Sequence, residues 1–174
     1  MKRFSKSGAT GVREDDKQAK NEKLSMFAYS LKRSEIFSNS SLAFLHALKP
    51  RFSRIFAPAA TVVTKENEEE DDLFYLVKGE VDVMVFDAMN NQPTLVTTLY
   101  PGATFGEIAL MVEEVEGKCA ATIRAKTDCH FLVINRIEFF SLLDKFPKEQ
   151  DAMIDIATRR GEEWKAVKKG TSTA

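Results

Sequence analysis

The stretch that decides the fold is GATFGEIALMVEEVEGKCAATIRA, residues 102–125. Within it a glycine, Gly106, is followed directly by an acidic residue, Glu107, at the start of a short apolar segment. A glycine lets the backbone approach a ligand closely, and the first free N–H groups of a helix attract an anion. A carboxylate cannot bind that anion, so hydroxyl groups are its expected partners. Backbone donors for a phosphate beside a carboxylate for a sugar predict a nucleotide site.

Two parts of this stretch resemble the phosphate-binding cassette of the cyclic nucleotide-binding domain family. The family pattern reads roughly Phe-Gly-Glu-Leu/Ile-Ala-Leu, a variable spacer, then Pro-Arg-Ala/Thr-Ala-Thr. Here Phe105–Leu110 match its first part and Ala120–Thr122 match its end. The resemblance covers about residues 30–165. It implies a regulatory module that binds cAMP or cGMP and performs no chemistry.

The resemblance also assigns roles to individual residues. Glu107 would bind the ribose 2′-hydroxyl, and the backbone amides of Gly106, Ile108 and Ala109 would bind the phosphate. The residue after the arginine position is a threonine in many cGMP-selective relatives, where its hydroxyl bonds the guanine. Here it is Ala120, which favours cAMP. An N-terminal helix charge stabilised by the macrodipole is the alternative explanation for Glu107.

The sequence departs from the family at the residue that should pair with the phosphate, because Cys119 stands in place of the arginine. A charge-assisted hydrogen bond to a desolvated anion contributes about 1.5–3 kcal/mol, which is about ten- to hundredfold in affinity. Lys118 is adjacent, but neighbouring strand residues face opposite ways, so it reaches the pocket only if the register shifts. Glutamates 113, 114 and 116 add negative charge nearby. The sugar site is thus expected to persist beside a weakened anion site.

In relatives the last helix closes over the base as a lid. By their spacing from the Phe146-Pro147 helix break, Arg160 and Trp164 fall on the turns that would face the ligand. The Trp164 ring could stack on a purine. It could equally pack the helix onto the sheets without touching a base. The resemblance implies that ligand moves the two C-terminal helices through a population shift.

Three hypotheses follow for the function. The first is a cyclic nucleotide sensor of reduced affinity, the second a site retuned to an uncharged purine nucleoside, and the third a ligand-free protein-interaction module. An enzyme is disfavoured, because the sequence has no nucleophile–base pair, no metal-ligand cluster and no phosphate-loop signature. We expect no cofactor, no metal and no nucleic-acid partner, with a protein effector as the further partner.

Composition fits one soluble domain with tails. The 174 residues carry a net charge of −1, and 44% of them are hydrophobic. Two cysteines without metal-ligand spacing indicate reduced thiols in a cytoplasmic setting. No apolar run approaches the roughly 18 residues of a membrane span. The acidic run 66–72 is expected to be a solvated loop. We predict a disordered basic tail over 1–23, the domain over 24–168 and a flexible end over 169–174.

The hydrophobic pattern predicts helices, then strands, then helices. Leu24 to Arg33 and Ser41 to Leu48 have helical spacing, with a capping serine before the second. Residues 52–134 contain short strands of alternating polarity between Pro, Gly and Asn turn signals. Residues 52–56, 61–63, 73–77, 81–86, 94–99, 119–125 and 129–134 are those strands. The helical period returns from Arg136. This order predicts an α+β fold, an antiparallel β-roll or jelly-roll of about eight strands flanked by helices.

Overall fold

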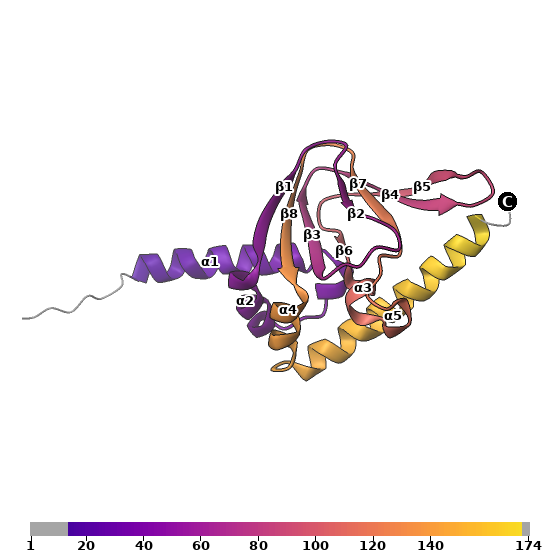
Figure 1. Ribbon diagram of the computed structural model, residues 1–174. Coiled ribbons are helices and arrows are strands. Elements are labelled where there is room, and N and C mark those ends of the chain that lie inside the picture. The colour runs from indigo at the N-terminus through magenta and orange to yellow at the C-terminus, as the bar shows by residue number, and fades with distance from the viewer. Residues whose placement is uncertain (1–13, 172–174) are drawn as a thin grey trace, which may run out of the picture.

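A computed structural model describes residues 14–171 and shows an α+β fold (Figure 1). Its α-helices are α1 (Glu14–Leu31), α2 (Leu42–Leu48), α3 (Glu107–Met111), α4 (Arg136–Leu143) and α5 (Pro147–Thr171). Its strands are β1 (Ser53–Ala57), β2 (Val62–Thr64), β3 (Asp72–Lys78), β4 (Val81–Asp87), β5 (Gln92–Leu99), β6 (Thr104–Phe105), β7 (Thr122–Ala125) and β8 (Cys129–Asn135). Short 3-10 turns lie at Glu35–Phe37, Lys49–Arg51 and Glu113–Val115.

The eight strands form two antiparallel four-stranded sheets, with strand orders β1-β8-β3-β6 and β2-β7-β4-β5. Alternating side chains of both sheets fill the space between them, as a sheet with one buried face requires. The rings of Phe74 and Phe105 stack there with centroids 4.9 Å apart, and Phe131 meets both of them edge-on. Through these ring contacts β6, the strand that leads into α3, packs against β3 and β8, the two central strands of its sheet.

A second core lies between the first sheet and the helices. It includes the buried faces of α2 and α4, the end of α1, Ile108, Leu110 and Met111 of α3, and the first half of α5. Trp164 of α5 packs against both cores. In Figure 1, α5 runs diagonally beneath the roll, passes α3 and ends beside the β4–β5 hairpin. The long C-terminal helix therefore crosses the edge of the roll at which the cassette lies.

The predicted α+β roll is confirmed, and each predicted strand has a counterpart within a few residues of its expected bounds. A serine caps α2, but it is Ser41, one residue after the stretch expected to supply the cap; its side chain accepts a hydrogen bond from the Phe44 amide. The sequence missed β6, which has two residues and therefore no alternation to detect. The helices after Arg136 are α4 and α5, and α5 continues without a break through Gly161.

The predicted boundary between tail and domain at residue 23 is wrong for residues 14–23, which belong to α1. Glu14 and Asp16 favour a helix N-terminus through the macrodipole, and the lysines, glutamates and alanine that follow are good helix formers. The pattern was missed because this half of α1 extends away from the body (Figure 1) and so has no apolar stripe. Residues 1–13 of the predicted tail, and residues 172–174 of the predicted flexible end, lie outside the described part of the chain.

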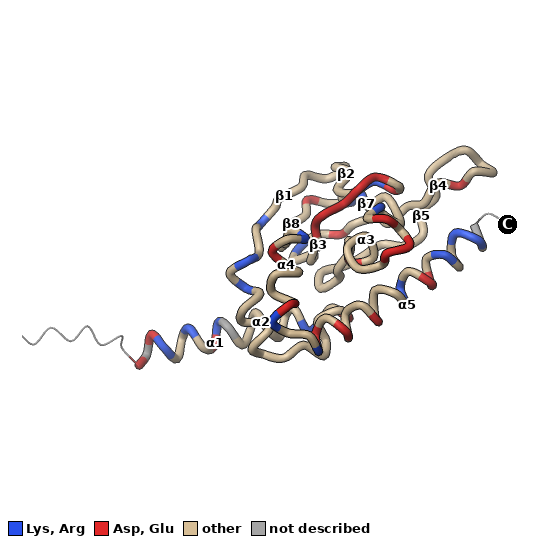
Figure 2. The backbone as a smooth tube through the Cα atoms, turned by 60° about the horizontal axis from the view of Figure 1, so that its bottom comes forward, with Lys and Arg blue, Asp and Glu red and all other residues tan. Residues whose placement is uncertain are grey.

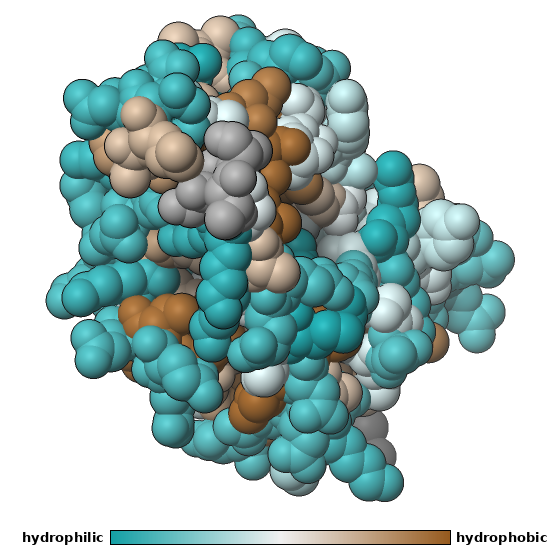
Figure 3. Space-filling view, turned by 90° about the vertical axis from the view of Figure 1, so that its right-hand side faces the viewer, coloured by the Kyte–Doolittle hydropathy of each residue, from teal (hydrophilic) through white to brown (hydrophobic). Residues whose placement is uncertain are grey.

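The acidic run 66–72 forms the β2–β3 connection, seen as the red band above α3 in Figure 2. One of its members, Glu66, accepts a hydrogen bond from the Phe86 amide and pairs with Lys168 of α5 at 2.7 Å. Within residues 14–171 no group of three His, Cys, Asp or Glu side chains is placed to hold a metal ion. From the side where α5 ends, the surface is mostly hydrophilic with separate apolar patches (Figure 3). None of the described helices has the length and apolar character needed to cross a membrane.

Candidate functional site

The cassette begins at a glycine that no other residue could replace without strain. Gly106 has a φ of +95°, and a Cβ at this position would stand 2.3 Å from the backbone oxygen of Asp72. The preceding Phe105 is held by its stack on Phe74. The chain therefore turns sharply at Gly106 into α3, with its backbone pressed against the start of β3.

Glu107, the first residue of α3, is buried with only 2% of its surface exposed. Its Oε1 atom lies 2.9 Å from Nη1 of Arg160. Its Oε2 atom is buried and has no hydrogen-bond partner among the described residues. Buried polar atoms are almost always paired, because an unmade hydrogen bond costs about 1–3 kcal/mol. One oxygen of the carboxylate is thus fully desolvated and still able to accept a hydrogen bond.

Arg160 comes from the middle of α5 and reaches across to the start of the cassette. Besides Glu107, its guanidinium contacts the hydroxyl and the backbone oxygen of Thr104 at 3.4 and 3.3 Å. Those two contacts are long for hydrogen bonds, whereas the ion pair is of ordinary length. The guanidinium is therefore held chiefly by Glu107.

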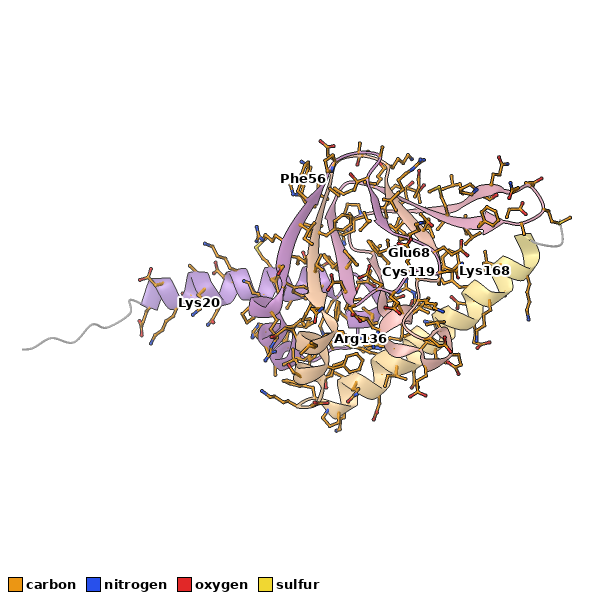
Figure 4. All side chains as sticks on the ribbon, in the orientation of Figure 1. Lys20, Phe56, Glu68, Cys119, Arg136 and Lys168 are labelled. Atoms are coloured by element: carbon orange, nitrogen blue, oxygen red, sulfur yellow. The ribbon has the colours of Figure 1, made fainter. Side chains whose placement is uncertain are left out.

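One helical turn after Arg160, Trp164 continues the contact between α5 and the roll. Between the two, Gly161 is buried, and the nearest side-chain atoms to a Cβ placed there are those of Val112 and Ile108, at 3.7–3.9 Å. The missing side chain lets α5 approach α3 closely. Farther along the helix, Lys168 pairs with Glu66 of the acidic loop. Figure 4 shows Lys168 on α5 facing the part of the roll that carries Glu68 and Cys119.

All eight predicted site residues line one cavity between the cassette, β7 and α5; these are Gly106, Glu107, Ile108, Ala109, Cys119, Ala120, Arg160 and Trp164. The remaining lining residues are Thr64, Val83, Leu99, Thr104, Phe105, Ala121 and Ile123. The cavity volume is about 70 Å³, whereas small-molecule sites typically measure about 300–1,000 Å³. Two of its lining residues, Arg160 and Trp164, come from α5.

The position of the family arginine carries no positive charge in this structure. Cys119 is buried at the cavity wall, and its amide donates to the backbone oxygen of Glu68 at 2.9 Å. Lys118 is exposed, lies 3.7 Å from Glu116, and does not line the cavity. The spacer therefore introduces no register shift that brings the lysine inward. Neither Glu116 nor the two glutamates of the 3-10 turn line the cavity.

The far end of α3 is fixed from outside the cavity by Arg136. Its guanidinium donates to the backbone oxygens of Ala109 and Leu110 at 3.1 and 3.2 Å, and pairs with Asp71 at 2.8 Å. These bonds satisfy carbonyl groups that the short helix leaves unpaired. The cassette is thus anchored at its start by an aromatic stack and at its end by an arginine.

Burial raises the pKa of Glu107 above its ordinary value, and the nearby Glu35 adds to the increase. The Arg160 guanidinium acts in the opposite direction on this pKa without cancelling the effect of burial. Burial also raises the pKa of the Cys119 thiol, with a further contribution from Glu70. The cysteine is accordingly a neutral part of the wall.

A larger hollow of about 610 Å³ lies elsewhere, between α1 and the outer face of the first sheet. It is lined by apolar and basic side chains, including those of Met26, Phe56 and Arg54. None of the eight predicted site residues takes part in it. This hollow is the larger of the two, but the buried carboxylate, whose Oε2 atom has no partner among the described residues, is in the smaller cavity.

Comparison with known proteins agrees with the location of the cassette. The family described as "Cyclic nucleotide-binding domain" matches residues 54–146, just over half of the chain. The chain belongs to the cyclic nucleotide-binding domain family. The match extends from β1 through the cassette to the end of α4, so the family region contains every element of the cavity except α5.

Among curated relatives, cGMP-dependent protein kinase 2 of Homo sapiens is 35% identical over 88 residues, which are 51% of this chain and 11% of the kinase. Patatin-like phospholipase domain-containing protein 7 of Rattus norvegicus is 27% identical over 110 residues, 63% of this chain and 8% of that protein. This cyclic nucleotide-binding domain therefore spans about a tenth of such relatives.

Solved structures share the fold. The regulatory domain of Toxoplasma gondii PKA, crystallised with cAMP, aligns over 84% of this chain and 52% of its own, with a TM-score of 0.67 and 19% identity. The Catabolite Activator Protein of Thermus thermophilus aligns over 74% of this chain and 58% of its own, with a TM-score of 0.63 and 21% identity.

Sequence reasoning placed Arg160 at the site but missed its ion pair with Glu107, and it missed Thr104 entirely. A strand of two residues gives no pattern from which Thr104 could be assigned. The pairing depends on how α5 crosses the roll, and helix spacing within α5 sets which residues face inward but not the distance to the cassette. The sequence did offer one signal for this ion pair, because Glu107 and Arg160 carry opposite charges and both were predicted to face the site.

Proposed function

We propose that this domain is a regulatory module that binds a cyclic nucleotide, cAMP in preference to cGMP, and signals by moving α5. The observation that carries the proposal is the buried Oε2 atom of Glu107, which has no partner among the described residues. A ribose hydroxyl would donate to this oxygen without breaking any existing bond. The position of Glu107 at the entrance to α3 is the one that the family uses for the sugar.

The preference for cAMP rests on Ala120, which lines the cavity and carries no hydroxyl. A threonine hydroxyl at this position would bond a polar group of guanine, whereas the methyl group of Ala120, beside Val83, Leu99 and Ile123, gives that group no partner. Unpaired polar groups in such surroundings cost free energy. We therefore expect cGMP to bind more weakly than cAMP.

Signalling follows from the size of the cavity. In this structure α5 lies over the cassette, and about 70 Å³ remains beneath it, so a nucleotide enters only if Trp164 or α5 as a whole moves outward. A ligand that binds only the opened arrangement shifts the population toward it. The output of the module is then the position of α5 relative to the roll.

A second function, a ligand-free interaction module, is favoured by the same small volume. Arg160 and Trp164 of α5 line this small cavity, and Arg160 pairs with the carboxylate that would hold the ribose. On this alternative α5 remains on the cassette permanently. An uncharged purine nucleoside is the remaining ligand, which would use Glu107 and need no cation.

Isothermal titration calorimetry with cAMP, cGMP and adenosine separates these functions. We expect saturable heat with cAMP, weaker binding of cGMP, and loss of binding in Glu107→Gln. Glu113→Gln is the matched control, because Glu113 is exposed in the next turn and does not line the cavity. Heat with adenosine alone would identify a nucleoside site. Absence of heat with all three ligands at millimolar concentration would leave the interaction module.

A further inference from the structure

We propose that Arg160 of α5 is the phosphate-binding cation of this domain, in place of the arginine that Cys119 replaces. This inference rests on the proposed function, because it assigns the anion of the same ligand. It makes the C-terminal helix part of the phosphate site, so the residue that holds the phosphate also belongs to the moving element.

The first support is the charge distribution around the cavity. Among the described residues that line it, Arg160 is the only lysine or arginine. Lys118 is directed to Glu116, and Arg136 is bound to the outer end of α3 and to Asp71. A desolvated phosphodiester needs a counter-charge that it can reach, and arginine binds phosphate with two parallel donors.

The second support is that the Arg160 guanidinium has more N–H donors than its bond to Glu107 uses. An arginine carries five N–H groups. Nη1 serves Glu107 at 2.9 Å, whereas the two contacts with Thr104 are 3.3 and 3.4 Å long. A phosphate would replace the contacts with Thr104 while the bond to Oε1 of Glu107 persists. The ribose would take the other carboxylate oxygen, Oε2, which is unpaired.

The third support is that the Glu107 carboxylate already orients this guanidinium at the cavity. In this structure Glu107 and Arg160 neutralise one another. A cyclic nucleotide adds one negative charge, which the backbone around Gly106 does not cancel, but which lies against a guanidinium already oriented by the carboxylate. The side chain of Arg160 is 21% exposed, so it can turn toward the phosphate as α5 moves outward without leaving Glu107 behind.

The test compares cAMP with adenosine, which differ by the cyclic phosphate, in calorimetric titrations of the full chain. We expect Arg160→Gln to raise the dissociation constant of cAMP about tenfold or more, the value of one charge-assisted bond. The dissociation constant of adenosine should change by less than about threefold. Arg159→Gln is the matched control: it removes the same charge from the adjacent residue, which pairs with Glu35 and Glu163 and does not line the cavity.

A rescue experiment guards against misfolding of the single variant. In Arg160→Gln/Cys119→Arg the cation returns at the family position, and cAMP affinity should recover while adenosine affinity stays constant. Near-ultraviolet circular dichroism confirms that each protein is folded. Where Arg160→Gln is unfolded, Arg160→Lys is used, which keeps the charge without the paired donors and should give an intermediate loss.

The experiment distinguishes failure of the Arg160 assignment from failure of the proposed function. If Arg160→Gln changed the dissociation constants of cAMP and adenosine equally, the role of Arg160 would be overturned and the proposed function would stand. The same would follow if Arg159→Gln lost as much cAMP affinity as Arg160→Gln. Failure of the wild-type chain to bind cAMP at millimolar concentration would overturn the proposed function itself, and the assignment of Arg160 with it.

Discussion

The guanidinium of Arg160 lies 2.9 Å from the carboxylate of Glu107 and joins the C-terminal helix to the first residue of α3. One partner is almost completely buried and the other is partly exposed. The pair therefore has two effects: it holds α5 on the roll, and it orients a carboxylate whose second oxygen has no hydrogen-bond partner in residues 14–171. Stability and ligand binding are linked through the same two side chains.

Removing the arginine should destabilise the domain. In Arg160→Gln the buried carboxylate loses its counter-charge, and we expect the free energy of unfolding at neutral pH to fall by about 1–3 kcal/mol. Urea denaturation followed by circular dichroism measures this. The exposed Arg159 serves as control, because its ion pairs are at the surface and contribute less than about 1 kcal/mol. Equal losses in the two variants would show that the pair with Glu107 adds nothing.

The pH dependence of stability should carry the signature of a carboxyl group with a raised pKa. Because burial raises the pKa of Glu107 above 4.5, the folded state binds a proton more tightly than the unfolded state. The stability that Glu107 contributes is then fully present below about pH 4.5 and is lost as the pH rises through the folded pKa.

The measurement is the free energy of unfolding of the wild type minus that of Glu107→Gln, followed between about pH 5 and 8. We expect this difference to fall as pH rises, since glutamine does not titrate. A difference that is constant, or that increases with pH, would contradict the raised pKa.

At Gly161, in the middle of α5, a substitution should raise the stability of the domain and lower its affinity for cAMP. In Gly161→Ala the new methyl group would meet Val112 and Ile108 at ordinary contact distances of 3.7–3.9 Å. Alanine also favours the helix by about 0.5–1 kcal/mol. We expect a gain in stability of this order and a cAMP affinity lowered about fourfold, since one buried methyl adds about 0.8 kcal/mol to the closed position.

Gly170→Ala is the control within the same helix, because no heavy atom of the described residues, apart from the backbone of the helix itself and the two neighbouring residues, lies within 4 Å of the position of its Cβ. It lies in the last turn, where helices fray, so its effect on stability should be smaller and cAMP affinity should not change. A loss of stability in Gly161→Ala would mean that the contact between α5 and α3 is closer than the structure shows.

Gly106, the glycine of the cassette, should behave in the opposite way to Gly161. Gly106→Ala places a methyl group 2.3 Å from the backbone oxygen of Asp72, at a φ of +95°. Both the clash and the left-handed backbone oppose it, and we expect a loss of about 2–4 kcal/mol in the free energy of unfolding. Thermal denaturation checks this, and a change below about 0.5 kcal/mol would show that the turn is free to relax.

The roll was predictable because its strands alternate and its turns carry Pro, Gly and Asn, which are local signals. The cassette was predictable because a glycine followed by a glutamate is uncommon and matches a known pattern over consecutive residues. The starting residue of α1 was not predictable from apolar periodicity. A helix that extends into solvent has residues of high helix propensity but no periodic apolar positions. The pair of Glu107 with Arg160 was not predictable either, because it depends on how a long helix crosses the roll.

The measurement that tests the account most directly is the fluorescence of Trp164, the one tryptophan of the chain, during titration with cAMP. Trp164 lines the cavity that the nucleotide would enter, so its emission reports both occupancy and displacement of α5. We predict a saturable change in emission in the wild type and in Glu113→Gln, and none at the same concentrations in Glu107→Gln. Calorimetric binding of cAMP with unchanged Trp164 emission, or an unchanged response after Glu107→Gln, would contradict the account.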